Sequence, residues 1–151
     1  MPVIYLETLI DAPIQTCFDY ARNVDAHMKS TEQTNEKAID GVTEGLMQAG
    51  DTVTWEATHF GMKQRLTAKI TGMNEPHWFI DEMTNGAFKS FVHTHRFEDL
   101  NGVTLMVDQF VYKAPLGILG NIANVLFLKN YMKNLLEKRA MELKKMVEAA
   151  V

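Results

Sequence analysis

Two histidines, His93 and His95, stand one residue apart in the segment SFVHTHRF (residues 90–97), which has the composition of a β-strand. Side chains two residues apart on a strand point to the same face, so the two imidazoles are predicted to lie side by side between Phe91 and Phe97. Such a pair could ligate a metal ion, form a catalytic acid–base pair, or supply the few polar groups of an apolar cavity.

The following strand supplies a carboxylate to this pair. The dipeptide Asn101–Gly102 predicts a two-residue hairpin turn, because a type I′ turn needs positive φ at both central residues. We expect the aromatic, histidine-bearing face of the hairpin to point inward. The register that this turn predicts pairs His95 with Asp108, His93 with Phe110, and Phe91 with Tyr112.

A metal site is the first of the three interpretations. Asp108 or His59 could complete a set of three protein ligands around the histidines. The segment also resembles a cupin metal motif, with His93, His95 and Glu98 as ligands. However, Glu98 points to the opposite face of the strand, and the second histidine motif of cupins is absent downstream. We therefore predict no metal and no other cofactor.

Catalysis and cavity lining are the other two interpretations. His95 opposite Asp108 matches a base oriented by a carboxylate, with His93 beside it. No nucleophile is placed next to them, which leaves acid–base chemistry such as cyclisation or dehydration. Alternatively, His95 and Asp108 satisfy each other in a half-polar cavity, while His93 meets a ligand, a water or a backbone carbonyl. We favour the cavity interpretation.

The first half of the chain predicts one strand, two short helices and a hairpin. The strand spans Val3 to Ile10, a helix follows Pro13, and a second helical turn covers residues 24–29. A turn at residues 60–61 sets Trp55 opposite Leu66, with His59 on the same apolar side. The other face of this hairpin then carries the charge pair of Glu56 and Arg65.

The second half predicts a meander closed by a long helix. Turn signals recur at residues 74–76, 85–87 and 101–102, and an amphipathic pattern then runs from Ile118 or Asn121 to Ala149. Roughly 28 helical residues span about 40 Å. One helix cannot cover a wide flat sheet, so six to seven antiparallel strands must curl around it. The predicted class is α+β.

Composition limits the function. The 151 residues suit a single domain, and a net charge of −4 argues against a nucleic-acid partner. We interpret the lone cysteine, Cys17, as a packing residue in a protein of a reducing compartment. We expect no signal peptide at the N-terminus. The uncharged segment 115–128 is too short for stable membrane insertion. We expect a cytoplasmic protein.

The order of elements resembles the SRPBCC superfamily, which includes START domains, pollen-allergen-like proteins and polyketide cyclases. The motifs that carry the resemblance are APIQTCFDY, VTWEATHFG and APLGILGNIANVLFLKNYMKNLLEKR, and they are most similar to an uncharacterised bacterial branch. The resemblance implies a helix-grip fold with a hydrophobic cavity between the curved sheet and the last helix. The positions expected to line this cavity are Trp55, His59, Phe91, His93, His95, Asp108, Phe110, Tyr112, Leu136 and Ala140.

We therefore expect the chain to bind a small, mainly hydrophobic molecule, with ligand access at loops near Gly61, Gly86 and Gly117–Gly120. The first alternative is a cofactor-free enzyme of the cyclase or dehydratase type that uses the His95–Asp108 pair, with His93 nearby. The second is an interaction module in which segment 115–128 docks to a partner or to a second copy as a homodimer.

Overall fold

The computed structural model describes residues 2–114 and 122–151, and the side chains of residues 2–114 and 125–151. The predicted access segment Gly117–Gly120 and half of segment 115–128 lie outside these residues. The first half of the chain forms β1 (Val3–Ile10), α1 (Ile14–Ala21), α2 (Val24–Ser30), the 3₁₀ helix η1 (Glu32–Thr34), β2 (Lys37–Gly41) and β3 (Thr52–His59). The second half forms β4 (Met62–Asn74), β5 (Trp78–Asn85), β6 (Ser90–Leu100), β7 (Val103–Lys113) and α3 (Ile122–Ala150).

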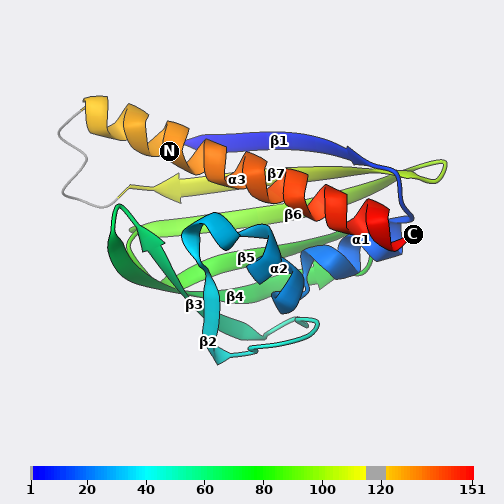
Figure 1. Cartoon of the computed structure of the whole chain (residues 1–151), viewed down its shortest axis with the longest axis horizontal. Coiled ribbons are helices and arrows are strands. Elements are labelled where there is room, and N and C mark those ends of the chain that lie inside the picture. Colours follow the sequence, from blue (N-terminus) through cyan, green and yellow to red (C-terminus); the bar gives the residue numbers. More distant parts are fainter. Residues whose placement is uncertain (1, 115–121) are drawn as a thin grey trace.

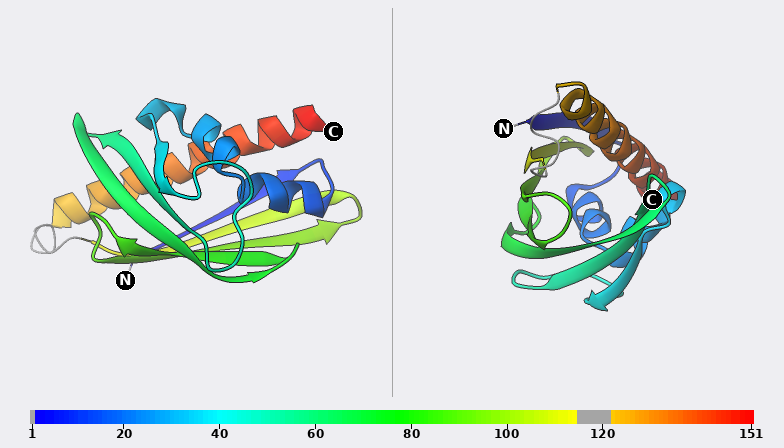
Figure 2. Two further views of the ribbon diagram at one scale, coloured as in Figure 1. Left: turned by 90° about the horizontal axis from the view of Figure 1, so that it is seen from below. Right: turned by 90° about the vertical axis from the view of Figure 1, so that its left-hand side faces the viewer.

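Seven antiparallel strands form one sheet in the order β1-β7-β6-β5-β4-β3-β2. The sheet curls around α3, which crosses its concave side together with the short helices α1 and α2 (Figures 1 and 2). Register shifts within β4, between Thr67 and Ala68 and between Ile70 and Gly72, bend the longest strand where the sheet turns. The predicted α+β helix-grip architecture is confirmed.

The predicted hairpin registers are also confirmed. His95 pairs with Asp108 and His93 with Phe110, across a turn in which Asn101 and Gly102 both have positive φ. In β6, Phe91, His93, His95 and Phe97 are buried, whereas their neighbours along the strand are half-buried or exposed. The aromatic, histidine-bearing face therefore points inward.

The hairpin of β3 and β4 also has the predicted register, with one buried and one outer face. Trp55 pairs with Leu66 and is buried, while Glu56 pairs with Arg65 on the outer face through an ion pair of 3.1 Å. Cys17 is buried in α1, in keeping with a packing role.

Helix α3 covers the concave face with one stripe. Leu136, Ala140, Leu143 and Val147 are buried along it, each about one turn from the next. In the described part of the chain, no helix combines the length and the apolar character needed to cross a bilayer.

Candidate functional site

A cavity of about 160 Å³ lies between the concave face of the sheet and α3. A single buried water needs only about 10–15 Å³ of such space, so the cavity has room for a small molecule. Most of its wall is apolar, and polar side chains interrupt the wall at a few points. The apolar lining comes from Trp55, Ala57, Leu66, Ala68, Phe91, Phe110, Met132, Leu135 and Leu136, and the buried or half-buried ionisable lining from His27, Glu36, His59, Asp81, His93 and Arg139.

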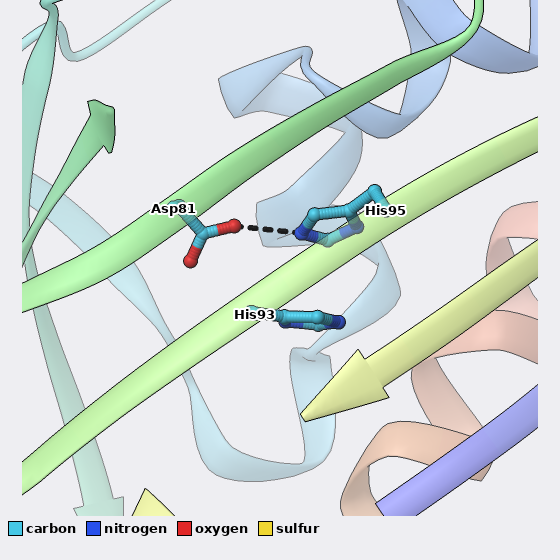
Figure 3. A group of neighbouring side chains, drawn as sticks. All are labelled: Asp81, His93 and His95. Atoms are coloured by element: carbon cyan, nitrogen blue, oxygen red, sulfur yellow. Dashed lines mark hydrogen bonds and ion pairs between the residues drawn. The ribbon is translucent and has the colours of Figure 1, made fainter. Parts of the chain in front are cut away.

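Two hydrogen bonds cross between three strands at the inner end of this wall. His93 of β6 bonds through Nε2 to Asp108 Oδ1 of β7 at 2.9 Å. His95 bonds through Nε2 to Asp81 Oδ2 of β5 at 2.6 Å, as Figure 3 shows together with the neighbouring ring of His93. Each bond is diagonal, because the direct register partners are His95 with Asp108 and His93 with Asp81. The predicted His95–Asp108 contact exists only as a 3.4 Å approach of Nδ1.

His95 favours the charged form. Burial lowers the pKa of His95, but the two carboxylates of Asp108 and Asp81 more than offset this and hold it above its ordinary value. Both of its ring nitrogens face carboxylate oxygens, and its ring stacks on Phe79 with centroids 4.2 Å apart. A cation over an aromatic face is stabilised by the ring quadrupole. His95 is therefore suited to be an imidazolium that holds two carboxylates.

His93 favours the neutral form. Burial and the neighbouring charge of His95 lower the pKa of His93, although the hydrogen bond to Asp108 acts in the opposite direction. An ionised carboxylate can only accept, so Nε2 of His93 carries the proton that it donates to Asp108. Nδ1 is then an unprotonated acceptor, and no described residue hydrogen-bonds to it. The pKa values of two neighbouring histidines are thus shifted in opposite directions.

Metal binding fits this geometry poorly. Asp81, His93 and His95 each place one donor atom within 4.8 Å of the others. However, the two imidazole rings are stacked, with centroids 3.8 Å apart and planes inclined by 26°. An ion between stacked rings would lie well outside both ring planes, whereas the nitrogen lone pair lies within the plane. The rings would have to turn away from Asp108 and Phe79 before an ion could bind.

A second polar group lies on the opposite side of the cavity. His27 of α2 bonds through Nε2 to Glu36 at 2.8 Å, and its ring stacks on Trp55 at 4.0 Å. Burial and the charge of Arg139 lower the pKa of His27, against the opposing effect of Glu36. His59 is also neutralised by burial, which lowers its pKa, and its Nδ1 lies 2.7 Å from the hydroxyl of Tyr131.

Arg139 is the half-buried cation of the cavity wall, whereas Arg65, which also borders the cavity, is exposed and paired with Glu56. It borders the main cavity and two smaller ones, of about 50 Å³ and about 10 Å³. Its charge acts on Asp81 and Glu36, whose pKa values are lowered although burial raises them, mainly because each bonds to a histidine. Among the described residues, no carboxylate lies within ion-pair distance of Arg139.

The ten predicted lining positions divide into three groups. Trp55, His59, Phe91, His93, Phe110 and Leu136 border the main cavity. His95, Asp108 and Ala140 border only the smallest one behind it. Tyr112 borders none of the three and packs in the core, and its hydroxyl has no hydrogen-bond partner among the residues that the structure describes.

Four polar residues of the site were missed by the sequence prediction. Asp81 has the inward parity of Phe79 on β5, which is a usable signal, and Arg139 stands three residues after Leu136 and four before Leu143 on the stripe of α3. His27 and Glu36 carry no such signal, because the fold alone brings α2 and the start of β2 to the cavity.

The chain matches no protein-family model and no curated protein. Solved structures do match over nearly its whole length. A crystal structure from Thermus thermophilus is 18% identical with a TM-score of 0.80, covering 99% of both chains. The solution structure of KanY protein is 15% identical with a TM-score of 0.76, covering 97% of both chains. Major latex-like protein 151 from Panax ginseng is 14% identical with a TM-score of 0.66, covering 96% of both chains.

At these identities the likeness concerns the fold alone. That fold is the helix-grip fold that the sequence resemblance implied.

Proposed function

We propose that this chain, acting as one domain over residues 1–151, binds a small and mainly apolar molecule in the cavity beneath α3. The observation that carries the proposal is a cavity of about 160 Å³ with a mostly apolar wall, well above the volumes of about 50 and about 10 Å³ of the two smaller cavities beside it. Water in contact with an apolar wall makes few hydrogen bonds there. An apolar ligand that displaces this water would therefore bind with a favourable free energy.

The polar groups of the wall suggest what the other end of the ligand carries. Arg139 has no ion-pair partner among the described residues, and His93 offers an unprotonated Nδ1. A ligand with a carboxylate or a similar acceptor would pair with the guanidinium through charge-assisted hydrogen bonds. We infer an apolar body with one acidic or strongly polar end directed toward Arg139.

Octanoic acid and 1-octanol test both statements, because they share a chain and differ in the end group. Binding is followed by the fluorescence of Trp55, which lines the cavity, in a Trp78→Phe background that removes the only other tryptophan. We expect both probes to bind. Arg139→Gln should weaken octanoate by about tenfold and leave octanol nearly unchanged, because only the acid loses a charge-assisted bond.

Two matched substitutions complete this experiment. Ala57→Phe fills the cavity and should abolish binding of both probes, whereas Ala149→Phe adds the same side chain at an exposed position of α3. Lys138→Gln removes an exposed charge one residue from Arg139 and should change nothing. Binding that survives Ala57→Phe in a folded variant would place the ligand elsewhere and contradict the proposal.

The same cavity supports a second candidate function, acid–base catalysis, with His93 rather than His95 as the base. His93 borders the main cavity and favours the neutral form, with Asp108 holding its Nε2–H and leaving Nδ1 free to take a proton. His95 favours the imidazolium form, so it has no free lone pair to act with.

Nitrogen NMR of histidine-labelled protein tests these assignments. We expect His93 to show one protonated and one unprotonated nitrogen near neutral pH, and His95 to show two protonated nitrogens. Exposed His77 provides a reference signal, and His93→Gln and His95→Gln assign the resonances. A doubly protonated His93 would exclude it as the base and leave ligand binding as the sole proposal.

A further inference from the structure

One end of the molecule exposes large apolar side chains. Phe60, in the turn between β3 and β4, is 59% exposed, and the adjacent Met62 is 65% exposed. Leu126 and Phe127 of α3 are each 57% exposed, and the rings of Phe60 and Phe127 lie 5.6 Å apart. We call these four residues the apolar tip. Such a cluster loses free energy to water unless something covers it.

The turn itself holds Phe60 outward. Phe60 has φ of +54° and Gly61 of +74°, so a phenylalanine occupies the left-handed conformation that asparagine or glycine normally takes. Stability alone does not favour a strained backbone with an exposed aromatic ring at one position. Strain of this kind is typical of functional positions.

The charged residues in the segments around the apolar tip are all lysines, and the nearest carboxylate that acts on this region, Glu36, is half-buried behind Tyr131 and bonded to His27. The segments that form this end of the molecule, residues 59–64, 84–91, 111–114 and 125–131, contain Lys63, Lys89, Lys113 and Lys129 but no aspartate or glutamate (Figure 1). All four lysines are exposed and make no ion pair among the described residues. By contrast, the four lysines further along α3 each lie near a glutamate. An unpaired basic cluster in a chain of net charge −4 attracts an anionic partner.

We propose that this end of the molecule docks onto membrane surfaces that contain anionic lipids. Exposed aromatic and aliphatic side chains enter the interfacial region of a bilayer, and surrounding lysines pair with anionic headgroups. The apolar tip is formed by protruding side chains from a turn and a helix start, which suits a deformable bilayer. No acidic residue in these segments opposes the approach of the headgroups.

The apolar tip is one layer of side chains away from the cavity. The ring of Phe60 packs on Tyr131 with centroids 4.6 Å apart, and Tyr131 bonds to His59, which lines the cavity. Docking would thus bring the cavity to the bilayer, so an apolar ligand could pass between them without crossing water. This transfer step rests on the proposed binding function, whereas docking does not.

Vesicle flotation without added ligand tests docking. The probes are vesicles of phosphatidylcholine alone and of phosphatidylcholine mixed with phosphatidylglycerol. We expect binding to the mixed vesicles only, and less binding as salt is raised, because salt screens the lysines. Replacing both Lys63 and Lys129 with glutamine should lower the affinity roughly 10- to 30-fold and flatten the salt dependence.

The apolar contribution is tested separately. Phe60→Ser with Phe127→Ser should reduce binding by at least about tenfold. Met141→Ser and Lys145→Gln are the matched controls, since Met141 is 56% exposed on the same helix and Lys145 lies near its C-terminal end. All these positions are exposed, so circular dichroism should show folded variants.

Three results would overturn the inference: no binding to mixed vesicles, equal binding to neutral vesicles, or equal loss in tip and control variants. A dimer that dissociates in the Phe60→Ser, Phe127→Ser variant would instead identify the apolar tip as a contact between two copies. Failure of octanoate binding would leave the flotation result unchanged, so the two proposals fail independently.

Discussion

The two histidines at positions 93 and 95 favour different charge states although their rings are in contact. His95 lies between two carboxylates and stacks on Phe79, which favours its proton, while His93 has one carboxylate and a cationic neighbour. Charging both rings at a centroid separation of 3.8 Å would bring two cations together in a buried site. The two groups therefore titrate as a coupled pair, and a ligand at His93 would also influence His95.

The lowered pKa of His93 predicts a loss of stability in mild acid. The folded chain protonates His93 only below the ordinary value of 6.5, whereas the unfolded chain does so near that value. The unfolded state then binds more protons, so the free energy of unfolding should fall as the pH drops below about 6.5, by up to about 1.4 kcal/mol per pH unit per histidine. Urea unfolding at a series of pH values measures this slope.

The variant that tests this slope is His93→Gln. Glutamine does not titrate, so this variant should unfold with a shallower pH dependence than the wild type. The contribution of His95 has the opposite sign: its raised pKa adds stability at low pH, which is lost as the pH rises through its folded value. If the free energy of unfolding depended equally on pH in the wild type and in His93→Gln, the lowered pKa of His93 would be refuted.

The short helix α2 is the element that brings His27 to the cavity. Its first turn is held by Asn23, whose side-chain oxygen accepts a hydrogen bond of 2.9 Å from the backbone N–H of Ala26. A helix of only two turns is marginal by itself, so its position depends on this cap and on packing against α3. The geometry of His27 relative to Glu36 and Trp55 thus depends in part on one capping residue.

Asn23→Ala should lower the free energy of unfolding by about 1 kcal/mol, the usual cost of losing an N-cap. It should also weaken octanoate binding slightly, because His27 and Trp55 would no longer stack in a fixed position. Asn130→Ala, at an exposed position inside α3, should cost nothing, since alanine favours helix interiors. Denaturant unfolding of the two variants compares them directly, and equal stabilities would show that the cap is dispensable.

Elements and their pairing could be predicted well from the sequence, because they depend on local patterns. Alternation along residues 90–97 and the turn at Asn101–Gly102 determined which face carries His93 and His95. The hydrogen bonds could not be predicted from register alone. Side chains lean along a strand, so each histidine reaches the carboxylate diagonal to it, and Asp81 enters the site from a third strand.

At the scale of the whole molecule, charge and exposed apolar surface are unevenly distributed. The end that carries the apolar tip has four lysines without an ion-pair partner in the described part of the chain, while the turn between β6 and β7 follows Glu98 and Asp99. Such an asymmetry would orient the molecule as it approaches a charged surface. It was not apparent from the sequence, because the four lysines come from four separate segments.

The placement of β1 beside β7 affects how the chain can be made. β1 is synthesised before the other strands, yet among the described residues its sheet neighbour is β7, the last strand. The pairing runs from Val3 with Val111 to Ile10 with Thr104. Until β7 is synthesised, the backbone groups of β1 lack their sheet partner. They are then open to chaperones and to strands of other nascent chains. Closure of the sheet is therefore a late event of biosynthesis, and a chain that stops before β7 would leave its first strand unpaired.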